Sequence, residues 1–147
     1  MKPRVVIIDD HTLVADACQL LLGPTCDVVG TFNEPRSFLE RAETLRPDVV
    51  ILDVSMPTLN GLDTARALLQ QLPDVRIIML TMNEDPDVAA EAFRVGAHGY
   101  VLKRSLGSEL PLAVREVMAQ RYYVTPLITR DLVGSLARDP HARRAVH

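Results

Sequence analysis

The sequence lacks several features that would assign the chain to particular classes of protein. It has no tryptophan and only two cysteines in 147 residues, and Cys18 and Cys26 do not have the spacing of a metal site. No apolar stretch is long enough to span a bilayer, and the first residues do not follow the pattern of a signal peptide. We therefore expect reduced core cysteines, a cytoplasmic location and no membrane partner.

Two further absences concern nucleic acids and nucleotides. The formal net charge is −3, so the chain as a whole has no electrostatic footprint for nucleic acid. No glycine-rich phosphate-binding loop follows the first apolar run, which argues against a nucleotide-binding domain. With 48% hydrophobic and 24% charged residues, the composition is that of an ordinary globular domain of one core.

Short β-branched runs alternate with amphipathic segments along the chain. The predicted strands are Val5–Asp9, Val28–Phe32, Asp48–Asp53, Arg76–Thr81 and Gly99–Lys103. The predicted helices are Thr12–Leu22, Pro35–Leu45, Asn60–Leu72, Asp87–Val95 and a last one capped by Ser108, with Pro111 in its first turn. This alternation predicts an α/β, flavodoxin-like, doubly wound parallel sheet of five strands in the order 2-1-3-4-5, with helices on both faces.

Polar side chains follow the apolar runs at the point where each predicted strand ends. They are Asp9, Asp10, Asp53, Thr81 and Lys103. Because the carboxyl ends of parallel strands meet at one edge of the sheet, we expect these groups to lie together there. Clustered carboxylates need positive charge, which a Mg²⁺ ion and Lys103 would supply. In such a field one carboxylate can attack phosphorus and form an acyl phosphate, so the edge predicts a site for a divalent cation and a phosphoryl group.

Four motifs in this order carry a family resemblance. They are IIDDHTLVADA at Ile7–Ala17, DVSMPTLNG at Asp53–Gly61, LT at Leu80–Thr81 and GAHGYVLK at Gly96–Lys103. Together they resemble the receiver domain of two-component response regulators, whose fold is the CheY-like form of the predicted sheet. The segments DHTLV and YYVTP resemble the LuxR/NarL-type subfamily, in which a helix-turn-helix DNA-binding domain follows the receiver.

The resemblance implies a role for each matching residue. Asp53 would be the phosphoacceptor, paired with Lys103. Asp10, Asp53 and the backbone carbonyl of Ser55 would bind Mg²⁺ directly, and Asp9 would bind it through water. Thr81 and Tyr100 would form the switch pair, and Pro57 and Gly61 would shape the loop after the acceptor, with a positive φ open to the glycine.

The same resemblance implies the partners. A sensor histidine kinase would donate the phosphoryl group, and the protein would catalyse only its own phosphorylation and dephosphorylation. Activation would favour a homodimer and control transcription, with DNA bound only through a helix-turn-helix domain that is absent from this chain.

Some positions depart from common receivers or carry no prediction of a ligand. Arg104 follows Lys103 where many receivers have a proline after a cis bond, so we expect a trans bond here. Ser55 and Asn83 stand at variable positions beside the site, which leaves the lifetime of the phosphoryl group open. His11 and His98 lack ligand spacing, so we interpret both as surface residues or neighbours of the site.

The domain organisation follows from a change of pattern after Arg121. Residues 1–121 are predicted to form the receiver, and residues 122–147 a helical linker and tail that would precede a DNA-binding domain. Thr125 and Pro126 begin the last predicted helix, whose apolar stripe is either a dimer face or a surface that docks on the receiver. The stripe contains Leu127, Ile128, Leu132 and Leu136.

Two alternative functions remain. A stand-alone receiver would act through protein contacts, whereas the fragment of a transcription factor, which we favour, would act through DNA. A haloacid-dehalogenase-type phosphatase has a similar set of Asp, Thr or Ser and Lys. That enzyme needs a second carboxylate two residues after its nucleophile, and here this position is Ser55. Its acidic pair also comes late in the chain, whereas here Asp9 and Asp10 come first.

Overall fold

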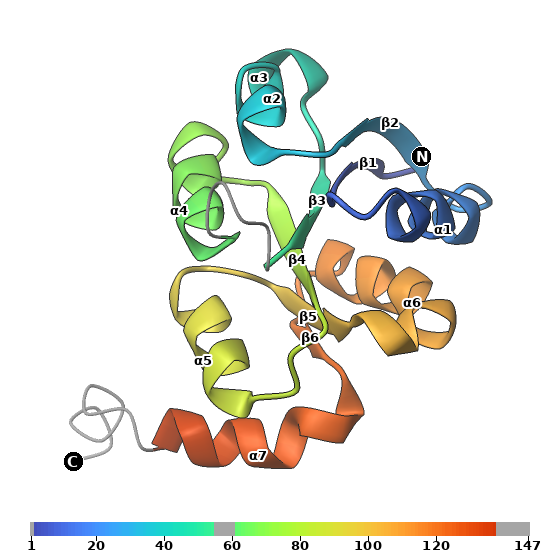
Figure 1. Cartoon of the computed structure of the whole chain (residues 1–147). Helices are drawn as coiled ribbons and strands as arrows, with labels where there is room; N and C mark the ends of the chain where they lie inside the picture. Colours follow the sequence, from blue (N-terminus) through green and yellow to red (C-terminus); the bar gives the residue numbers. More distant parts are fainter. Residues whose placement is uncertain (1, 55–60, 138–147) are drawn as a thin grey trace.

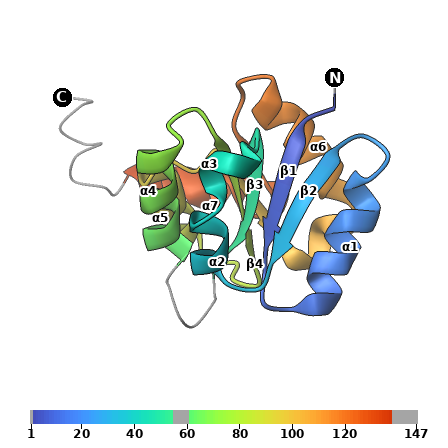
Figure 2. The ribbon, with the colours of Figure 1, turned by 90° about the horizontal axis from the view of Figure 1, so that it is seen from above.

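The structure is a computed structural model that describes residues 2–54 and 61–137. Its described part contains one parallel sheet of six strands in the order β2-β1-β3-β4-β5-β6 (Figures 1 and 2). The strands are β1 (Arg4–Ile8), β2 (Asp27–Phe32), β3 (Val49–Asp53), β4 (Arg76–Thr81), β5 (Gly99–Leu102) and β6 (Tyr123–Val124). The predicted order 2-1-3-4-5 is confirmed, and β6 adds a sixth strand beside β5.

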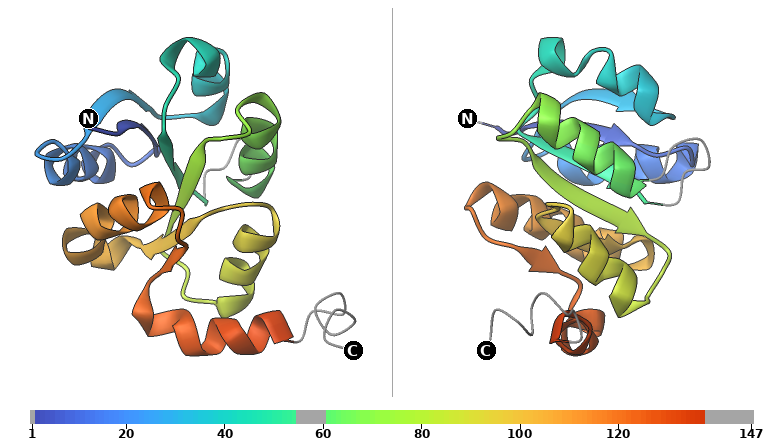
Figure 3. Two further views of the ribbon diagram at one scale, coloured as in Figure 1. Left: turned by 180° about the vertical axis from the view of Figure 1, so that it is seen from behind. Right: turned by 90° about the vertical axis from the view of Figure 1, so that its left-hand side faces the viewer.

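Helices cover both faces of the sheet. They are α1 (Thr12–Leu22), α2 (Pro35–Leu39), α3 (Ala42–Leu45), α4 (Gly61–Gln71), α5 (Pro86–Arg94), α6 (Leu106–Met118) and α7 (Pro126–Ala137). In Figures 1 and 3, α1 and α6 lie on one face and α2 to α5 on the other, whereas α7 runs past the β6 edge next to α5. A 3₁₀ turn at Lys103–Ser105 joins β5 to α6.

Alternate residues of each central strand pack into two separate cores. Val6 and Ile8 of β1 join the core beneath α2 to α5, and Val5 and Ile7 join the core beneath α1 and α6. All four side chains are fully buried, as expected for a strand whose sequence is a continuous run of β-branched residues. Burial on both faces holds the strand ends in one rigid edge, and this edge positions the polar groups of the site.

Several predicted element boundaries were wrong. The helix predicted at Pro35–Leu45 is broken in two at Arg41, whose φ of −114° and ψ of 3° lie outside the helical region. The last receiver helix begins at Leu106, so Ser108 does not cap it; the Ser108 hydroxyl instead donates to the Ser105 carbonyl oxygen at 3.3 Å. Pro111 therefore lies in the second turn, where its missing N–H removes one helical hydrogen bond.

The apolar stripe of the last helix docks on the receiver. Ile128 and Leu132 of α7 are buried in the core that contains α5, and Leu136 packs against it, whereas Leu127 is 60% exposed. Of the two alternatives for the stripe, a dimer face or a surface that docks on the receiver, the structure shows docking. No helix in residues 2–54 and 61–137 has the length and apolar character needed to cross a membrane.

Candidate functional site

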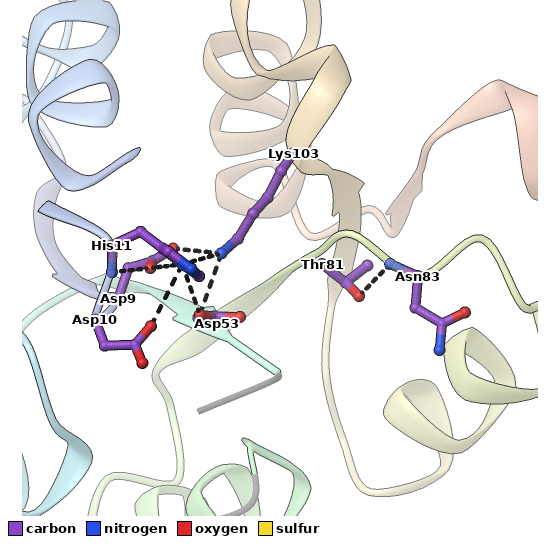
Figure 4. Close-up of polar contacts among 7 residues, drawn as sticks. All are labelled: Asp9, Asp10, His11, Asp53, Thr81, Asn83 and Lys103. Carbon is purple, nitrogen blue, oxygen red and sulfur yellow. Dashed lines mark hydrogen bonds and ion pairs between the residues drawn. The ribbon is translucent and has the colours of Figure 1, made fainter. Parts of the chain in front are cut away.

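Asp9 and Asp53 are neighbours because β1 and β3 are adjacent in the sheet. Asp9 directly follows β1, Asp53 ends β3, and Ile8 pairs with Leu52 in the parallel register. Both carboxylates are almost fully buried, with 2% and 0% exposure, whereas Asp10 faces solvent. The prediction that these three carboxylates meet at the edge of the sheet is therefore confirmed (Figure 4).

Lys103 reaches into this pair of buried carboxylates from the 3₁₀ turn that directly follows β5. Its Nζ atom lies 3.1 Å from Asp9 Oδ2 and 3.2 Å from Asp53 Oδ2, and the residue is only 8% exposed. The peptide bond that follows, between Lys103 and Arg104, is trans as predicted. One ammonium thus balances two carboxylates that would otherwise repel each other in a low-dielectric setting.

His11 also belongs to the site. Its Nδ1 atom lies 3.1 Å from Asp9 Oδ1, 3.4 Å from Asp10 Oδ1 and 3.8 Å from Asp53 Oδ2. Its backbone N–H donates to Asp9 Oδ1 at 2.8 Å, which holds the loop after β1 in place. Sequence reasoning allowed that His11 was a neighbour of the site but did not place its ring among the carboxylates. Its position directly after two site aspartates was the available signal.

Burial controls the ionisation of Asp9. Desolvation raises the pKa of this carboxyl above its ordinary value, and the negative charge of Asp53 adds to the rise. Hydrogen bonds from the His11 backbone and from Lys103 act in the opposite direction. Because Asp9, Asp10 and Asp53 gather around a single ammonium, a cation that binds beside Asp9 would favour its charged form.

Thr81 and Tyr100 are joined through Asn83. The Thr81 hydroxyl, at the end of β4, accepts a hydrogen bond from the Asn83 backbone N–H at 2.9 Å. The Tyr100 hydroxyl donates to the Asn83 carbonyl oxygen at 3.1 Å, and its ring is fully buried. Burial is the main cause of the raised pKa of Tyr100. Sequence reasoning placed Asn83 beside the site without foreseeing that it bridges these two residues.

The donor set fits a divalent cation. Asp9, Asp10, His11 and Asp53 offer ligand atoms that all lie within 4.8 Å of one another. Three carboxylates are the oxygen donors that Mg²⁺ prefers. The predicted carbonyl ligand from Ser55 and the loop residue Pro57 lie outside the described residues.

Gly61 has a steric role next to the acceptor. A Cβ atom at this position would lie 2.6 Å from Val54 Cα and 3.0 Å from the Asp53 carbonyl oxygen. The start of α4 therefore packs directly on the backbone that carries Asp53. A glycine is needed at position 61 because any larger residue would collide with the backbone of Val54 and Asp53.

Comparison with protein families agrees with this geometry. The model of the response regulator receiver domain matches residues 5–115, which include every described residue of the site. The chain belongs to the response regulator receiver family. It is a signalling domain, and its relatives act as transcriptional regulators.

Similar receivers occur in LuxR/NarL-type regulators, as the resemblance predicted. The chain is 32% identical over 139 residues to the transcriptional regulatory protein DegU of Brevibacillus brevis, covering 93% of this chain and 59% of DegU. It is 39% identical over 120 residues to the DNA-binding transcriptional activator DevR/DosR of Mycobacterium tuberculosis, covering 80% and 55%. The receiver chain thus spans a little over half the length of these relatives.

Solved structures show the same fold. A LuxR-family response regulator from Aurantimonas sp. SI85-9A1 matches with a TM-score of 0.87 and 27% identity, over 94% of this chain and 100% of that one. The isolated receiver of RcsB from Salmonella enterica serovar Typhimurium, solved with the phosphomimetic BeF₃⁻, matches with a TM-score of 0.82 and 26% identity, over 88% and 98%.

Proposed function

We propose that the receiver accepts a phosphoryl group on Asp53 in the presence of Mg²⁺ and that a sensor histidine kinase supplies it. The observation that carries this proposal is the Lys103 ammonium between two buried carboxylates, 3.1 Å from Asp9 and 3.2 Å from Asp53. An ionised carboxylate beside a fixed cation can attack phosphorus while the cation neutralises the charge on the transferring group.

The transfer step follows from the chemistry of the two groups. A carboxylate oxygen of Asp53 forms a bond to phosphorus, the P–N bond of a phosphohistidine breaks, and the released imidazole nitrogen takes a proton from solvent. The Lys103 ammonium would pair with the new negative charge on the phosphoryl group. Asp10 and Asp53 would hold the metal directly, with the Ser55 carbonyl, and Asp9 would hold it through water. When bound, Mg²⁺ supplies positive charge to the phosphoryl oxygens. Hydrolysis of the acyl phosphate then resets the domain, so its only catalysis acts on itself.

The output belongs to the same proposal. Residues 1–121 form the receiver and residues 122–147 a linker and tail that lead to a helix-turn-helix domain, through which the whole protein binds DNA. In support, DevR/DosR is a DNA-binding activator, and RcsB, which this chain resembles with a TM-score of 0.85 and 25% identity, has been solved as a complex with DNA. Phosphorylation would favour a homodimer, and the compartment would be the cytoplasm. A receiver that acts alone through protein contacts would instead have a reading frame that ends near residue 147.

The test is phosphoryl uptake from acetyl phosphate, followed by intact mass with and without Mg²⁺. We expect one added phosphoryl group that depends on Mg²⁺ and disappears in Asp53→Asn. Asp74→Asn is the matched control, because this exposed carboxylate lies at the opposite edge of the sheet, before β4. Steady release of phosphate without an adduct would favour the phosphatase, and no reaction would contradict the proposal.

A further inference from the structure

Thr125 connects the site strand β5 to the helix α7. Its backbone N–H donates to the Tyr100 carbonyl oxygen at 3.0 Å, and its hydroxyl accepts from the Leu102 backbone N–H at 3.0 Å. The residue is 1% exposed and directly precedes α7. Thr125 therefore makes hydrogen bonds to the residues on both sides of Val101, at the end of β5 just before Lys103.

Two routes lead from the site to Thr125. In the first, Lys103 contacts Asp53 and is joined by one peptide bond to Leu102, whose N–H bonds to Thr125. In the second, the Thr81 hydroxyl bonds to Asn83 N–H and the Asn83 carbonyl bonds to the Tyr100 hydroxyl. The Tyr100 carbonyl then bonds to the Thr125 N–H. A displacement of Lys103 or Thr81 thus reaches Thr125 through contiguous bonds.

The helix α7 packs on a buried cluster that includes Tyr100, which lies on the second of these routes. Ile128 and Leu132 are 3% and 6% exposed, and they share one buried cluster with the Tyr100 ring and with Ala89 and Ala90 of α5. Figure 1 shows α7 running beside α5 at the edge of the molecule, with β6 leading into it. The helix α7 packs mainly on α5, and its buried residues Ile128 and Leu132 share a cluster with the Tyr100 ring, so a change in the position of Tyr100 alters part of the surface that holds α7.

We propose that the docking of α7 is the output switch of this receiver and that Thr125 transmits the state of Asp53 to it. The inference rests on the proposed function, since it needs a phosphoryl group at Asp53. That group adds three acceptor oxygens and about −1.5 to −2 charges, which draw the Lys103 ammonium and the Thr81 hydroxyl toward it. The end of β5 follows Lys103, the bonds to Thr125 change, and the equilibrium shifts toward a state in which α7 is loosened.

A cysteine placed on the buried face of α7 measures this equilibrium. Ser135 is 3% exposed and close to cysteine in size, so Ser135→Cys reports undocking through its rate of alkylation by iodoacetamide. Val133→Cys is the matched control, because Val133 lies on the same helix at 64% exposure. The native Cys18 and Cys26 are 0% and 5% exposed, and the wild-type chain gives their background rate. Mass spectrometry reads phosphoryl uptake and alkylation in the same sample.

With acetyl phosphate and Mg²⁺, we expect the alkylation rate of Ser135→Cys to rise about tenfold, within the usual range of coupling between sites. Val133→Cys keeps its rate, and Asp53→Asn abolishes the rise. Complete phosphoryl uptake with an unchanged rate would overturn this inference alone. Absence of uptake would overturn the proposed function and the inference with it.

Variants of Thr125 test the route itself. Thr125→Val keeps the shape of the side chain but removes the acceptor for the Leu102 N–H, so we expect normal phosphoryl uptake together with a faster alkylation rate that no longer responds to it. Thr125→Ser retains the hydroxyl and is expected to restore the response. A response in Thr125→Val equal to that of wild type would exclude the route. Hydrogen exchange of α7 in the wild-type chain gives a readout that depends on no variant.

Discussion

Lys103 Nζ lies 3.2 Å from Asp53 Oδ2, although the two residues are 50 positions apart in the chain. The contact forms because β3 and β5 flank β4 and end at the same edge of the sheet, so that the long side chain of Lys103 can reach Asp53. A contact of this separation depends on the complete sheet. The arrangement of the site residues therefore depends on the folding of the whole domain.

Removing the Lys103 ammonium should destabilise the domain most strongly when no metal is present. Lys103→Met leaves Asp9 and Asp53 buried without their cation, which we expect to lower the free energy of unfolding by about 3–5 kcal/mol. Mg²⁺ should recover part of this loss. Urea unfolding with and without Mg²⁺ measures both effects, and Lys2→Met, at an exposed lysine, is the control. An equal loss of unfolding free energy in Lys103→Met and Lys2→Met would contradict the conclusion that Lys103 neutralises the buried carboxylates.

Asp9→Asn should stabilise the metal-free domain near neutral pH. Because burial raises the folded-state pKa of Asp9 above its ordinary value of 3.8, the charged carboxylate disfavours folding at higher pH. This penalty fades as the pH falls through the raised pKa and is gone below 3.8. The gain in Tm from Asp9→Asn should therefore be present near pH 7 and shrink toward pH 4. Thermal unfolding across this range measures it, and Asp16→Asn, at an exposed position of α1, should show no such gain.

His98 should make the domain less stable as the pH falls below neutrality. Its Nδ1 accepts a hydrogen bond from the Ile77 N–H at 3.1 Å, and burial, aided by the charge of Arg76, lowers its pKa below 6.5. As the pH falls through 6.5, His98 becomes protonated in the unfolded chain but stays neutral in the folded chain. The free energy of unfolding therefore decreases until the pH reaches the lower pKa of His98 in the folded chain.

Two substitutions separate the charge of His98 from its hydrogen bond. His98→Asn offers an amide oxygen to Ile77 but cannot be protonated, and it should flatten the dependence of Tm on pH between about 7 and 5. His98→Phe also cannot be protonated and should flatten the pH dependence in the same way, but because it removes the acceptor it should be about 1–3 kcal/mol less stable than His98→Asn at every pH. An unchanged pH slope in His98→Asn would rule out His98 as its source.

Gly61→Ala should disturb the acceptor through its backbone. The added Cβ would lie 2.6 Å from Val54 Cα, so the start of α4 or the end of β3 must shift, and we expect a loss of about 1–3 kcal/mol with slower phosphoryl uptake. The matched control is Gly107→Ala in α6, where a Cβ meets nothing within 4 Å and should stabilise the helix by about 0.5–1 kcal/mol. Uptake at the wild-type rate in Gly61→Ala would refute the role of this close approach.

Most strands could be predicted from the sequence, because each is a short β-branched run bounded by polar residues. β6 was not predicted as a strand, since the two residues of Tyr123–Val124 are too few to show a period and acquire their pairing from Gly99 and Tyr100. The break at Arg41 and the early start of α6 were missed for a related reason. Helix ends depend on packing against the sheet more than on local propensity.

The sequence by itself determined five of the chemical groups of the site, because Asp9, Asp10, Asp53, Thr81 and Lys103 each lie at the end of a run that forms a buried strand. Only the tertiary structure decided how these groups pair. The His11 ring lies among the carboxylates, Asn83 bridges Thr81 and Tyr100, and Thr125 connects β5 to α7. The contacts of His11 with Asp53, of Asn83 with Tyr100 and of Thr125 with Leu102 join segments that are far apart in the chain, and they form only when the parallel sheet brings the strand ends together.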